Sequence, residues 1–281
     1  MKGIILAGGL GTRLYPITKT CTKQLLPIFD KPMIFYPLTT LMQMGIKDIL
    51  CICKKNDLLS YKNILNNGSQ WGINIKFAIQ KKPAGIAESF IIGKNFIGKD
   101  DVTLILGDNI FFGIDDNLSK FKDGAKIFAY KVQDPSRYGV VFLKNDLPYK
   151  IIEKPKKTKS NLAVTGLYMF DNSVVDIARK IKPSKRKELE ITDINNSFIN
   201  KGKMKASILG PGCMWLDAGT FVSLLQASLY VQTIQERQNM LIGSPELTAF
   251  QKKFISKKKI INYLKKQPNN SYFNFLRQNI L

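Results

Sequence analysis

The 281-residue sequence contains no histidine. Imidazole is the usual general base of Ser-His and Cys-His nucleophile pairs and a common ligand of zinc and haem, so these mechanisms and sites are excluded. Any catalysis must therefore use carboxylates, lysines, arginines, backbone dipoles or a hard metal ion.

Cysteine is scarce, and long apolar runs are missing. The four cysteines, Cys21, Cys51, Cys53 and Cys213, are too few for a disulfide scaffold, and no second closely spaced pair completes a zinc site. No apolar run reaches about 18 residues, and the short apolar start is broken by glycines and Arg13. We therefore expect buried free thiols, no signal peptide, no membrane partner and a cytoplasmic location.

Acidic residues are also few. The chain has 43 Lys and Arg against 21 Asp and Glu, a formal net charge of +22. A positive field attracts nucleic acids, membrane surfaces and small anions such as nucleotides. However, nearly all the basic residues are lysine, as compositional drift would produce. The charge alone leaves both interpretations open.

The first part of the chain alternates strand and helix patterns. A buried strand is predicted at residues 3–7, directly before a glycine-rich turn. The next predicted elements are strands at residues 49–53, 73–79 and 102–106 and helices at 33–44, 56–68 and 86–92, with Asn56 as an N-cap and Gly45 as a helix stop. This alternation predicts an α/β fold with a mostly parallel sheet covered by helices and ligands at the carboxyl ends of its strands.

From about Lys126 extended segments predominate. The predicted strands are residues 126–132, 138–143, 149–153, 162–170, 204–209 and 214–216, and the predicted helices are 191–200 and 220–235. Residues from Pro245 onward are helical in pattern and dense in lysine. We expect one body of residues 1–242 with a helical C-terminal appendage of residues 243–281. The apolar spacing of Phe221, Leu224, Leu225 and Leu229 suits a core or a subunit contact, and core burial is the default.

The turn Gly8-Gly9-Leu10-Gly11-Thr12-Arg13-Leu14 is the first candidate site. Closely spaced glycines let backbone N–H groups approach phosphate oxygens, and Arg13 offers a planar fork of donors. The turn lacks the GK[ST] of a P-loop, and Pro16 interrupts the helix that a dinucleotide-binding fingerprint requires. A nicotinamide-binding domain is therefore disfavoured. Lys23 and Lys31 flank the same loop.

Longer motifs carry a resemblance to a known family. The strings G-G-x-G-T-R-L-x-P-x-T, K-x-L-L-P and K-P-M resemble the signature of the sugar-nucleotide pyrophosphorylases. The likeness continues in the same order through residues 80–87, 106–109, 134–141, 153–155, 163–168, 188–193 and 215–220. The segments ELEITDIN and WLDAGT are most similar to the thymidylyltransferase branch. Three positions depart from the pattern in the loop that the resemblance assigns to nucleotide selectivity: Ala84, where relatives generally carry aspartate, and Lys81 and Lys82.

The resemblance implies a Rossmann-like nucleotidyltransferase fold and a homotetramer. It also implies Mg²⁺-assisted attack of glucose 1-phosphate on the α-phosphate of dTTP, which gives dTDP-glucose, a precursor of dTDP-sugars, and pyrophosphate. Asp108 and Asp217 each end an apolar run, where carboxylates suit Mg²⁺, and the resemblance assigns both to the metal.

The resemblance implies the following roles for individual residues. The predicted catalytic residues are Arg13, Lys23 and Lys154. The predicted nucleotide contacts are Leu6, Gly8, Gly9, Gly11, Thr12, Gln80, Pro83, Gly85 and Asp108, with Gly85 expected to let the backbone approach the base. The predicted sugar-phosphate contacts are Asn109, Tyr138, Gly139, Glu153, Lys154 and Val164.

Two alternatives are kept. A relative that uses UTP, CTP or ATP with the same or another sugar 1-phosphate would carry nearly the same motifs. A basic nucleic-acid-binding protein is the alternative from a different class, but it rests on charge alone because no nucleic-acid-binding motif accompanies the lysines. We therefore expect no specific nucleic-acid partner.

Overall fold

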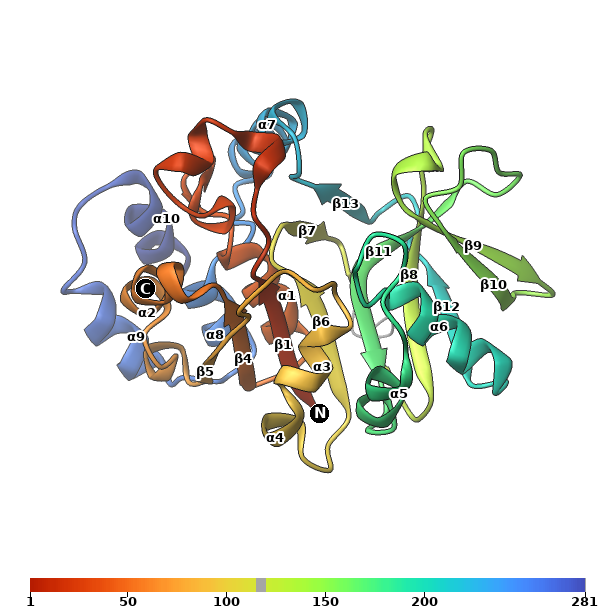
Figure 1. Cartoon of the computed structure of the whole chain (residues 1–281). Helices are drawn as coiled ribbons and strands as arrows, with labels where there is room; N and C mark the ends of the chain where they lie inside the picture. Colours follow the sequence, from red (N-terminus) through yellow and green to blue (C-terminus); the bar gives the residue numbers. More distant parts are fainter. Residues whose placement is uncertain (115–119, 281) are drawn as a thin grey trace.

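The computed structural model describes residues 1–114 and 120–280 and centres on one mixed sheet (Figure 1). Its parallel half has the order β6-β1-β4-β5. The four strands are β1 (Lys2–Ala7), β4 (Asp48–Cys53), β5 (Asn74–Ile79) and β6 (Val102–Leu106). Gly8, Gln80 and Asp108 follow β1, β5 and β6 at or just beyond the carboxyl ends of these strands, so the parallel register brings three predicted site residues to one edge.

The other half of the sheet is mainly antiparallel. It contains β8 (Ala125–Lys131), β9 (Gly139–Lys144), β10 (Leu147–Glu153), β11 (Leu162–Phe170) and β12 (Met204–Ile208). Strand β11 joins the halves because it pairs antiparallel with β6, β8 and β9. The predicted α/β class with a mixed, helix-covered sheet is confirmed.

Two small sheets flank the large one. Strand β7 (Asn109–Phe112) pairs with β13 (Met214–Asp217), and Asp217 lies opposite Asn109 in this register. Strand β2 (Pro27–Ile28) pairs with β3 (Lys31–Pro32). The β7–β13 pair is what carries the 214–217 segment back to the end of β6.

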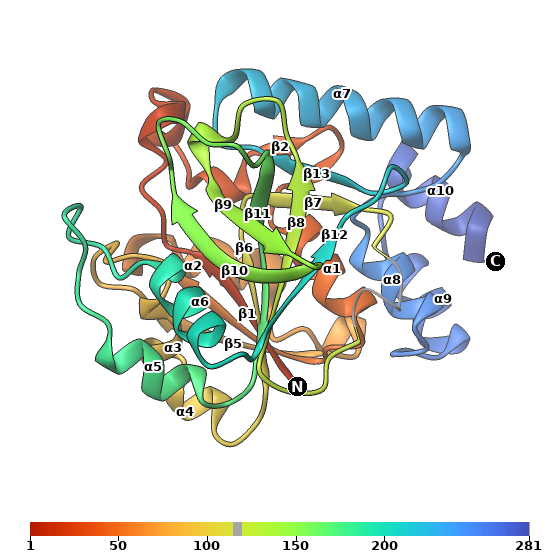
Figure 2. The same cartoon turned by 90° about the vertical axis from the view of Figure 1, so that its right-hand side faces the viewer.

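Helices cover both faces of the sheet (Figure 2). One face packs against α3 (Glu88–Ile92), α5 (Val174–Lys180) and α6 (Ile191–Asn200), and the short α4 (Lys94–Ile97) follows α3. The other face packs against α1 (Phe35–Gln43), α2 (Leu58–Leu65), α8 (Pro245–Gln251), α9 (Lys257–Leu264) and α10 (Ser271–Ile280). Helix α7 (Phe221–Gln238) lies beside β2 and encloses a third, smaller cluster.

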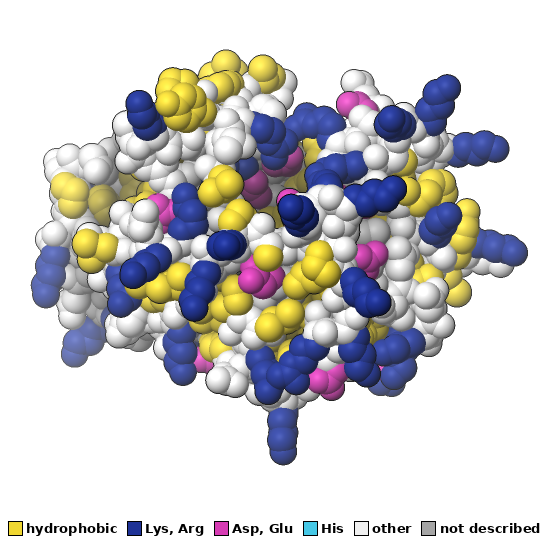
Figure 3. Space-filling view, viewed as in Figure 1, with side chains coloured by type: hydrophobic (Ala, Val, Ile, Leu, Met, Phe, Trp, Pro, Cys, Tyr) yellow, Lys and Arg dark blue, Asp and Glu magenta, His cyan; other side chains and the backbone are white. Residues whose placement is uncertain are grey.

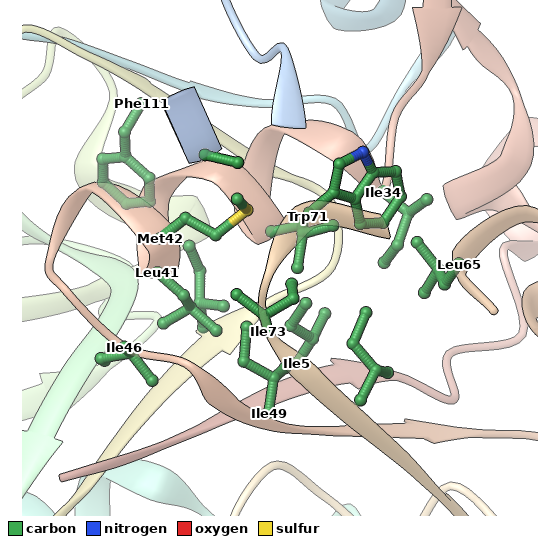
Figure 4. Close-up of a cluster of buried hydrophobic side chains, with 14 of the residues drawn as sticks. Ile5, Ile34, Leu41, Met42, Ile46, Ile49, Leu65, Trp71, Ile73 and Phe111 are labelled. Carbon is green, nitrogen blue, oxygen red and sulfur yellow. The ribbon is translucent and has the colours of Figure 1, made fainter. Parts of the chain in front are cut away.

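The core beneath α1 shows why the sequence pattern predicts this fold. Ile5 of β1 and Ile49 of β4 point inward and lie in one cluster with Leu41 of α1 (Figure 4). Cys51, two residues after Ile49, is buried in the same cluster. The intervening residues, such as Leu50, face the second cluster on the opposite side. Both faces are buried, which explains the continuous apolar runs of these strands.

The helices after residue 242 complete this first cluster. Ala249, Ile260 and Leu276 are buried in the same cluster as Ile5. The boundary near Ile242 stays a prediction. Of the range predicted for the appendage, Leu281 lies outside the described residues.

Several local predictions need correction. Asn56 is not an N-cap: a 3₁₀ turn covers Lys55–Asp57, and α2 begins at Leu58 after Asp57. The elements β2, β3, β7, α4 and α5 were not expected, because each is short. Gly45 follows α1 with a φ of 81°, which agrees with its predicted role as a helix stop. No helix within residues 1–114 and 120–280 has the length and apolarity that a membrane crossing needs.

Candidate active site

Two cavities lie at the carboxyl edge of the parallel strands. Their volumes are about 220 and 330 Å³, and Arg13, Asp108 and Glu188 line both. Figure 3 shows acidic side chains recessed in a hollow near the middle of this face, with Lys and Arg side chains around it. The two cavities share two carboxylates and one guanidinium, and the Arg13 guanidinium is placed to attract an anionic ligand in either cavity.

The glycine-rich turn lines the 330 Å³ cavity. Gly11 has a φ of 65° and opens a 3₁₀ turn that contains Arg13, and Thr18 Oγ1 donates to the Gly11 carbonyl at 3.0 Å. At Gly219 a Cβ would lie 2.9 Å from an Arg13 Nη atom. Glycine at position 219 therefore lets the turn after β13 approach the Arg13 guanidinium closely.

Lys23, which is buried, and Asp108, which is partly buried, form an ion pair between the first loop and the end of β6. Burial alone would raise the pKa of Asp108, but the Lys23 ammonium and a hydrogen bond from Asn109 hold that pKa below its usual value. The carboxylate is therefore ionised at neutral pH, as a metal site requires.

Both the nitrogen and the oxygen of the Asn109 side-chain amide make hydrogen bonds within the protein. Its Nδ2 donates to Asp108 Oδ1 at 2.9 Å, and its Oδ1 accepts from Gly166 N at 3.0 Å and Trp215 Nε1 at 2.6 Å. A Cβ at Gly166 would lie 2.5 Å from Asn109 Oδ1, so only glycine allows this approach. Asn109 thus orients the Asp108 carboxylate, and a direct contact to the sugar phosphate stays a prediction.

Strand β13 brings a second carboxylate to Asp108. Ala218 N donates to the Asp108 carbonyl at 3.1 Å, and Arg137 lies 3.8 Å from Asp217 Oδ2. Burial and the neighbouring negative charge of Asp108 raise the pKa of Asp217, while Lys23, Arg13 and Arg137 oppose that rise.

The donor set at this point fits a magnesium ion. Asp108 and Asp217 offer hard carboxylate oxygens that repel one another, and a divalent cation between them would relieve that repulsion. Within the described ranges, no group of three or more His, Cys, Asp or Glu side chains is placed to hold a metal. Two protein carboxylates suit Mg²⁺, which keeps several waters and takes phosphate oxygens as ligands.

Glu153 and Lys154 line the 220 Å³ cavity, as do Tyr138, Gly139 and Val164. Glu153 Oε2 accepts from Thr192 Oγ1 at 2.7 Å, and Glu153 Oε1 lies 3.2 Å from Arg186 Nη2 and 3.7 Å from Lys154 Nζ. Lys154 has a φ of 42°, which is unusual for a residue with a Cβ. The five predicted sugar-side residues apart from Asn109 are thus brought together, and Asn109 lines the same cavity.

Only some of the residues predicted to contact the nucleotide line one of the two cavities. Pro83 lines the 330 Å³ cavity with Gly9, Gly11 and Thr12. Leu6, Gly8, Gln80 and Gly85 line neither of these two cavities. For Gly8 and Gly85, the described contacts show that glycine is needed because another part of the protein packs closely against it. A Cβ at Gly8 would lie 2.1 Å from Gln80 Oε1, and one at Gly85 would lie 2.4 Å from the Leu189 carbonyl oxygen.

The side-chain nitrogen and the backbone N–H of Gln80 already make hydrogen bonds within the protein. Its Nε2 donates to Glu88 Oε2 at 2.7 Å, and its backbone N–H donates to the Cys53 carbonyl at 2.9 Å. Its Oε1 packs against Gly8, and a contact from Gln80 to the base stays a prediction.

Some cavity residues escaped the sequence prediction. Three of the six arginines, Arg13, Arg137 and Arg186, line the 220 Å³ cavity, but only Arg13 was predicted. Arg186 lies 2.7 Å from Glu190 and 3.2 Å from Glu153. The other missed residues are Ile86, Leu106, Gly166, Tyr168, Glu188, Glu190, Ile191, Thr192, Asn195 and Trp215. Most of these missed residues lie inside segments that carry the family resemblance. Their position in those segments is the sequence feature that could have identified them.

Comparison with known proteins gives consistent matches. The nucleotidyl transferase family model matches residues 2–234. A glucose-1-phosphate thymidylyltransferase of Neisseria meningitidis is 48% identical over 98% of both chains, and one of Mycobacterium tuberculosis is 46% identical over the same shares.

Solved structures agree with these matches. A putative glucose-1-phosphate thymidylyltransferase from Bacillus anthracis, in complex with a sucrose, has a TM-score of 0.76 and 41% identity, covering 82% of this chain and 94% of its own. A UDP-glucose pyrophosphorylase complexed with UDP-glucose has a TM-score of 0.73 and 25% identity, covering 83% and 98% respectively.

Proposed function

The chain belongs to the nucleotidyl transferase family, and from that premise we propose that it is a glucose-1-phosphate thymidylyltransferase, forming dTDP-glucose and pyrophosphate from dTTP and glucose 1-phosphate. The observation that carries the proposal is 46–48% identity to two such enzymes over 98% of the chain. The two cavities that meet at Arg13 and Asp108 support it, because the reaction joins two anionic substrates.

The proposed mechanism needs no protein nucleophile. A phosphate oxygen of glucose 1-phosphate attacks the α-phosphorus of dTTP in line, and the bond from that phosphorus to the bridging β-phosphate oxygen breaks, so pyrophosphate leaves with the electron pair. Catalysis then consists of positioning and charge neutralisation. Arg13 would neutralise the departing pyrophosphate, Lys23 the nucleotide phosphates and Lys154 the attacking phosphate.

Asp108 and Asp217 would hold Mg²⁺ beside these cations. When bound, the ion polarises phosphoryl oxygens and offsets negative charge where the substrates meet. The protein's own part is to hold the two carboxylates together: Lys23 and Asn109 fix the Asp108 side chain, and the β7–β13 pairing places Asp217 against it.

A nucleotide panel tests the proposal. Purified protein, Mg²⁺ and glucose 1-phosphate are mixed with dTTP, UTP, CTP or ATP, and pyrophosphate release is followed, with Arg13→Ala protein as the control for contaminating activity. We expect dTTP to react fastest. A clear preference for another nucleotide would reassign the base, as the likeness to UDP-glucose pyrophosphorylase and the departures at Lys81, Lys82 and Ala84 make worth testing. No release with any nucleotide would overturn the proposal.

We also propose a homo-oligomer, the tetramer that the resemblance implies. Four apolar side chains on α7 are exposed, Phe221 by 45%, Val222 by 66%, Leu225 by 61% and Leu229 by 52%, so the default of core burial is wrong for Phe221, Leu225 and Leu229. Leu224 is partly buried against the third cluster. Phe29 lies beside the exposed side chains, since its N–H donates to Ser228 Oγ at 3.3 Å, and Figure 3 shows apolar side chains gathered over this end of the molecule. Light scattering of the purified protein measures the oligomeric state directly.

We propose no specific nucleic-acid partner. The lysines that follow residue 250 are partly engaged with the fold: Lys259 Nζ, for example, donates to the Ser69 carbonyl at 2.6 Å. DNA binding should therefore be weak and vanish with added salt, whereas sub-micromolar binding at physiological salt would contradict this. We also propose a reducing, cytoplasmic compartment, which the lack of a disulfide among the four described cysteines supports.

A further inference from the structure

Asn195 is a buried asparagine whose side-chain amide has no hydrogen-bond partner in the part of the chain that the structure describes. It lies on α6, lines the 220 Å³ cavity and is 1% exposed. Its Oδ1 accepts no hydrogen bond within the part of the chain that the structure describes, and its Nδ2 has no acceptor there either. Leaving such a group unpaired costs stability, so a buried amide of this kind requires an explanation.

The next residue shows how this helix satisfies an amide that serves the fold. Asn196 Oδ1 accepts from Ile151 N at 3.0 Å, and Asn196 Nδ2 donates to the Ile151 carbonyl at 3.0 Å. Asn196 thus ties α6 to β10 with both halves of its amide. Asn195 has the same chemistry and more burial, but it makes neither kind of bond.

The surroundings of Asn195 indicate what its partner is. One helical turn earlier, Thr192 Oγ1 donates to Glu153 Oε2, and both residues line the same cavity. The hydroxyl of Tyr168, which also lines that cavity, has no hydrogen-bond partner within residues 1–114 and 120–280 either. Charges for the phosphates come from Arg13 and Lys154, so neutral groups in this cavity match the uncharged part of the ligand.

We propose that Asn195 selects the sugar by hydrogen-bonding one hydroxyl group of the hexose ring. This inference rests on the proposed function and adds a specificity-determining residue to it. A hydroxyl donates and accepts, and so does an amide, so a single contact can satisfy both. The terminal torsion of asparagine is soft, which lets the amide turn towards the ligand. The free protein thus keeps an unsatisfied group that the substrate completes.

Deoxy analogues of glucose 1-phosphate test the proposal. Wild-type kcat/KM is compared for glucose 1-phosphate and its 2-, 3-, 4- and 6-deoxy forms, and the same series is measured for Asn195→Leu. The wild type should disfavour one analogue by roughly 5–150-fold more than the variant does, the factor for leaving a buried amide unpaired. In the variant, KM for glucose 1-phosphate should rise while KM for dTTP stays within about twofold of wild type.

A stability measurement separates this role from a structural one. Asn195→Leu should have a Tm equal to or above that of the wild type, because it removes an unpaired buried amide. Asn196→Leu is the matched comparison and should lower Tm, because it breaks two bonds to Ile151. Asn200→Ala, on the exposed end of α6, should change neither Tm nor selectivity.

The outcomes are distinct. If wild-type protein releases pyrophosphate with glucose 1-phosphate but Asn195→Leu keeps the wild-type pattern across the deoxy series, Asn195 does not read the sugar. A lower Tm with equal losses for every analogue would assign Asn195 a structural role and also overturn the proposal. If Asn195→Leu does not fold, Asn195→Ala gives the same comparison. Wild-type protein that is inactive with glucose 1-phosphate would instead contradict the proposed function.

Discussion

Leu189 donates its backbone N–H to the carbonyl of Ala84 at 2.7 Å. The reverse connection also exists, because Ala87 N donates to the Leu189 carbonyl at 3.2 Å. The segment after β5, where the base side is predicted, is therefore joined to the loop that carries Glu188 and Glu190 into the sugar-side cavity. Gly85 lies at the junction, with a φ of 106°.

Gly85→Ala should weaken this junction. A Cβ at this position would lie 2.4 Å from the Leu189 carbonyl oxygen, and the positive φ is strained for alanine. We expect a loss of at least about 2 kcal/mol in the free energy of unfolding and a rise in KM for both substrates. Chemical denaturation and initial rates measure the two effects. Gly210→Ala is the control, since its added Cβ meets nothing within 4 Å, and an equally stable Gly85→Ala would contradict the argument.

The fold followed from periodicity because its strands are buried on both faces. The short apolar runs of β1, β4 and β6 lie between helical segments and are bounded by turn residues, and this pattern predicts buried strands. By contrast, α4 and α5 are too short for a helical period to emerge, and Asn56 has the right residue type for a cap although the chain forms a 3₁₀ turn there. The exposed face of α7 was misjudged because an apolar stripe has the same pattern whether it meets a core or another subunit.

The candidate site was predicted in part. Arg13, Lys23 and Asp108 lie in recognisable motifs beside strand ends, and the structure brings them together. The contacts of Asn109, Gly85 and Arg186 could not be predicted, because each depends on a segment more than 30 residues away in the chain that packs against it. A motif indicates that a residue matters, whereas the packing decides whether it touches a ligand or holds another side chain.

Arg13→Ala should remove turnover without unfolding the protein. Arg13 is exposed on a 3₁₀ turn and lines both cavities, so its loss leaves the core intact. By analogy with a lost oxyanion donor, kcat should fall by roughly 10²–10³, or about 2.7–4 kcal/mol. Pyrophosphate release and thermal unfolding are the measurements. Arg179→Ala, on the exposed side of α5, should retain full activity, and full activity of Arg13→Ala would exclude its assigned role.

Glu246 anchors the C-terminal helices. This buried carboxylate accepts from Tyr272 at 2.6 Å, from Trp71 Nε1 and Tyr263 at 3.2 Å each, and from Ser244 at 3.3 Å. Glu246→Ala would leave Trp71 Nε1 and Tyr263 OH without this acceptor, while Ser244 and Tyr272 can still bond each other, so we expect a loss of at least about 3 kcal/mol in the free energy of unfolding. Denaturant titration measures the loss.

Limited proteolysis shows where the effect of Glu246→Ala lies. New cleavage should occur between α8 and α10, because Glu246 links α8 to residues of α9 and α10. Glu246→Gln keeps an acceptor and should lose less stability. Glu236→Ala is the matched control, since the exposed Glu236 accepts one surface hydrogen bond from Gln232 on the same helix and its loss should change stability by less than about 0.5 kcal/mol. Wild-type stability in Glu246→Ala would contradict the anchoring role.

The four thiols should divide into two pairs in a labelling experiment. Burial raises the pKa of Cys51, and burial with the charge of Asp57 raises the pKa of Cys53 to about 11. The thiolate is the reactive form, so at pH 8 only about one Cys53 side chain in 10³ is reactive. Iodoacetamide should label the half-buried Cys21 and Cys213 first, as mass spectrometry would show. Reaction of Cys51 and Cys53 should require denaturant, and rapid labelling of all four in folded protein would contradict their placement.

Asp217→Asn should separate metal binding from stability. In metal-free protein, two largely buried carboxylates face each other, and the pKa of Asp217 is raised by burial and by Asp108. Removing one negative charge should stabilise the metal-free fold by about 1 kcal/mol, or roughly 2–4 °C in Tm. The same change removes a ligand, so the Mg²⁺-dependent rise in Tm of the wild type should disappear and turnover should fall at least about 10²-fold. Asp176→Asn, an exposed change on α5, is the control for the loss of one charge. A variant that keeps the wild-type response to Mg²⁺ would show that Asp217 does not hold the ion, and a lower Tm without metal would show that its charge is needed by the fold itself.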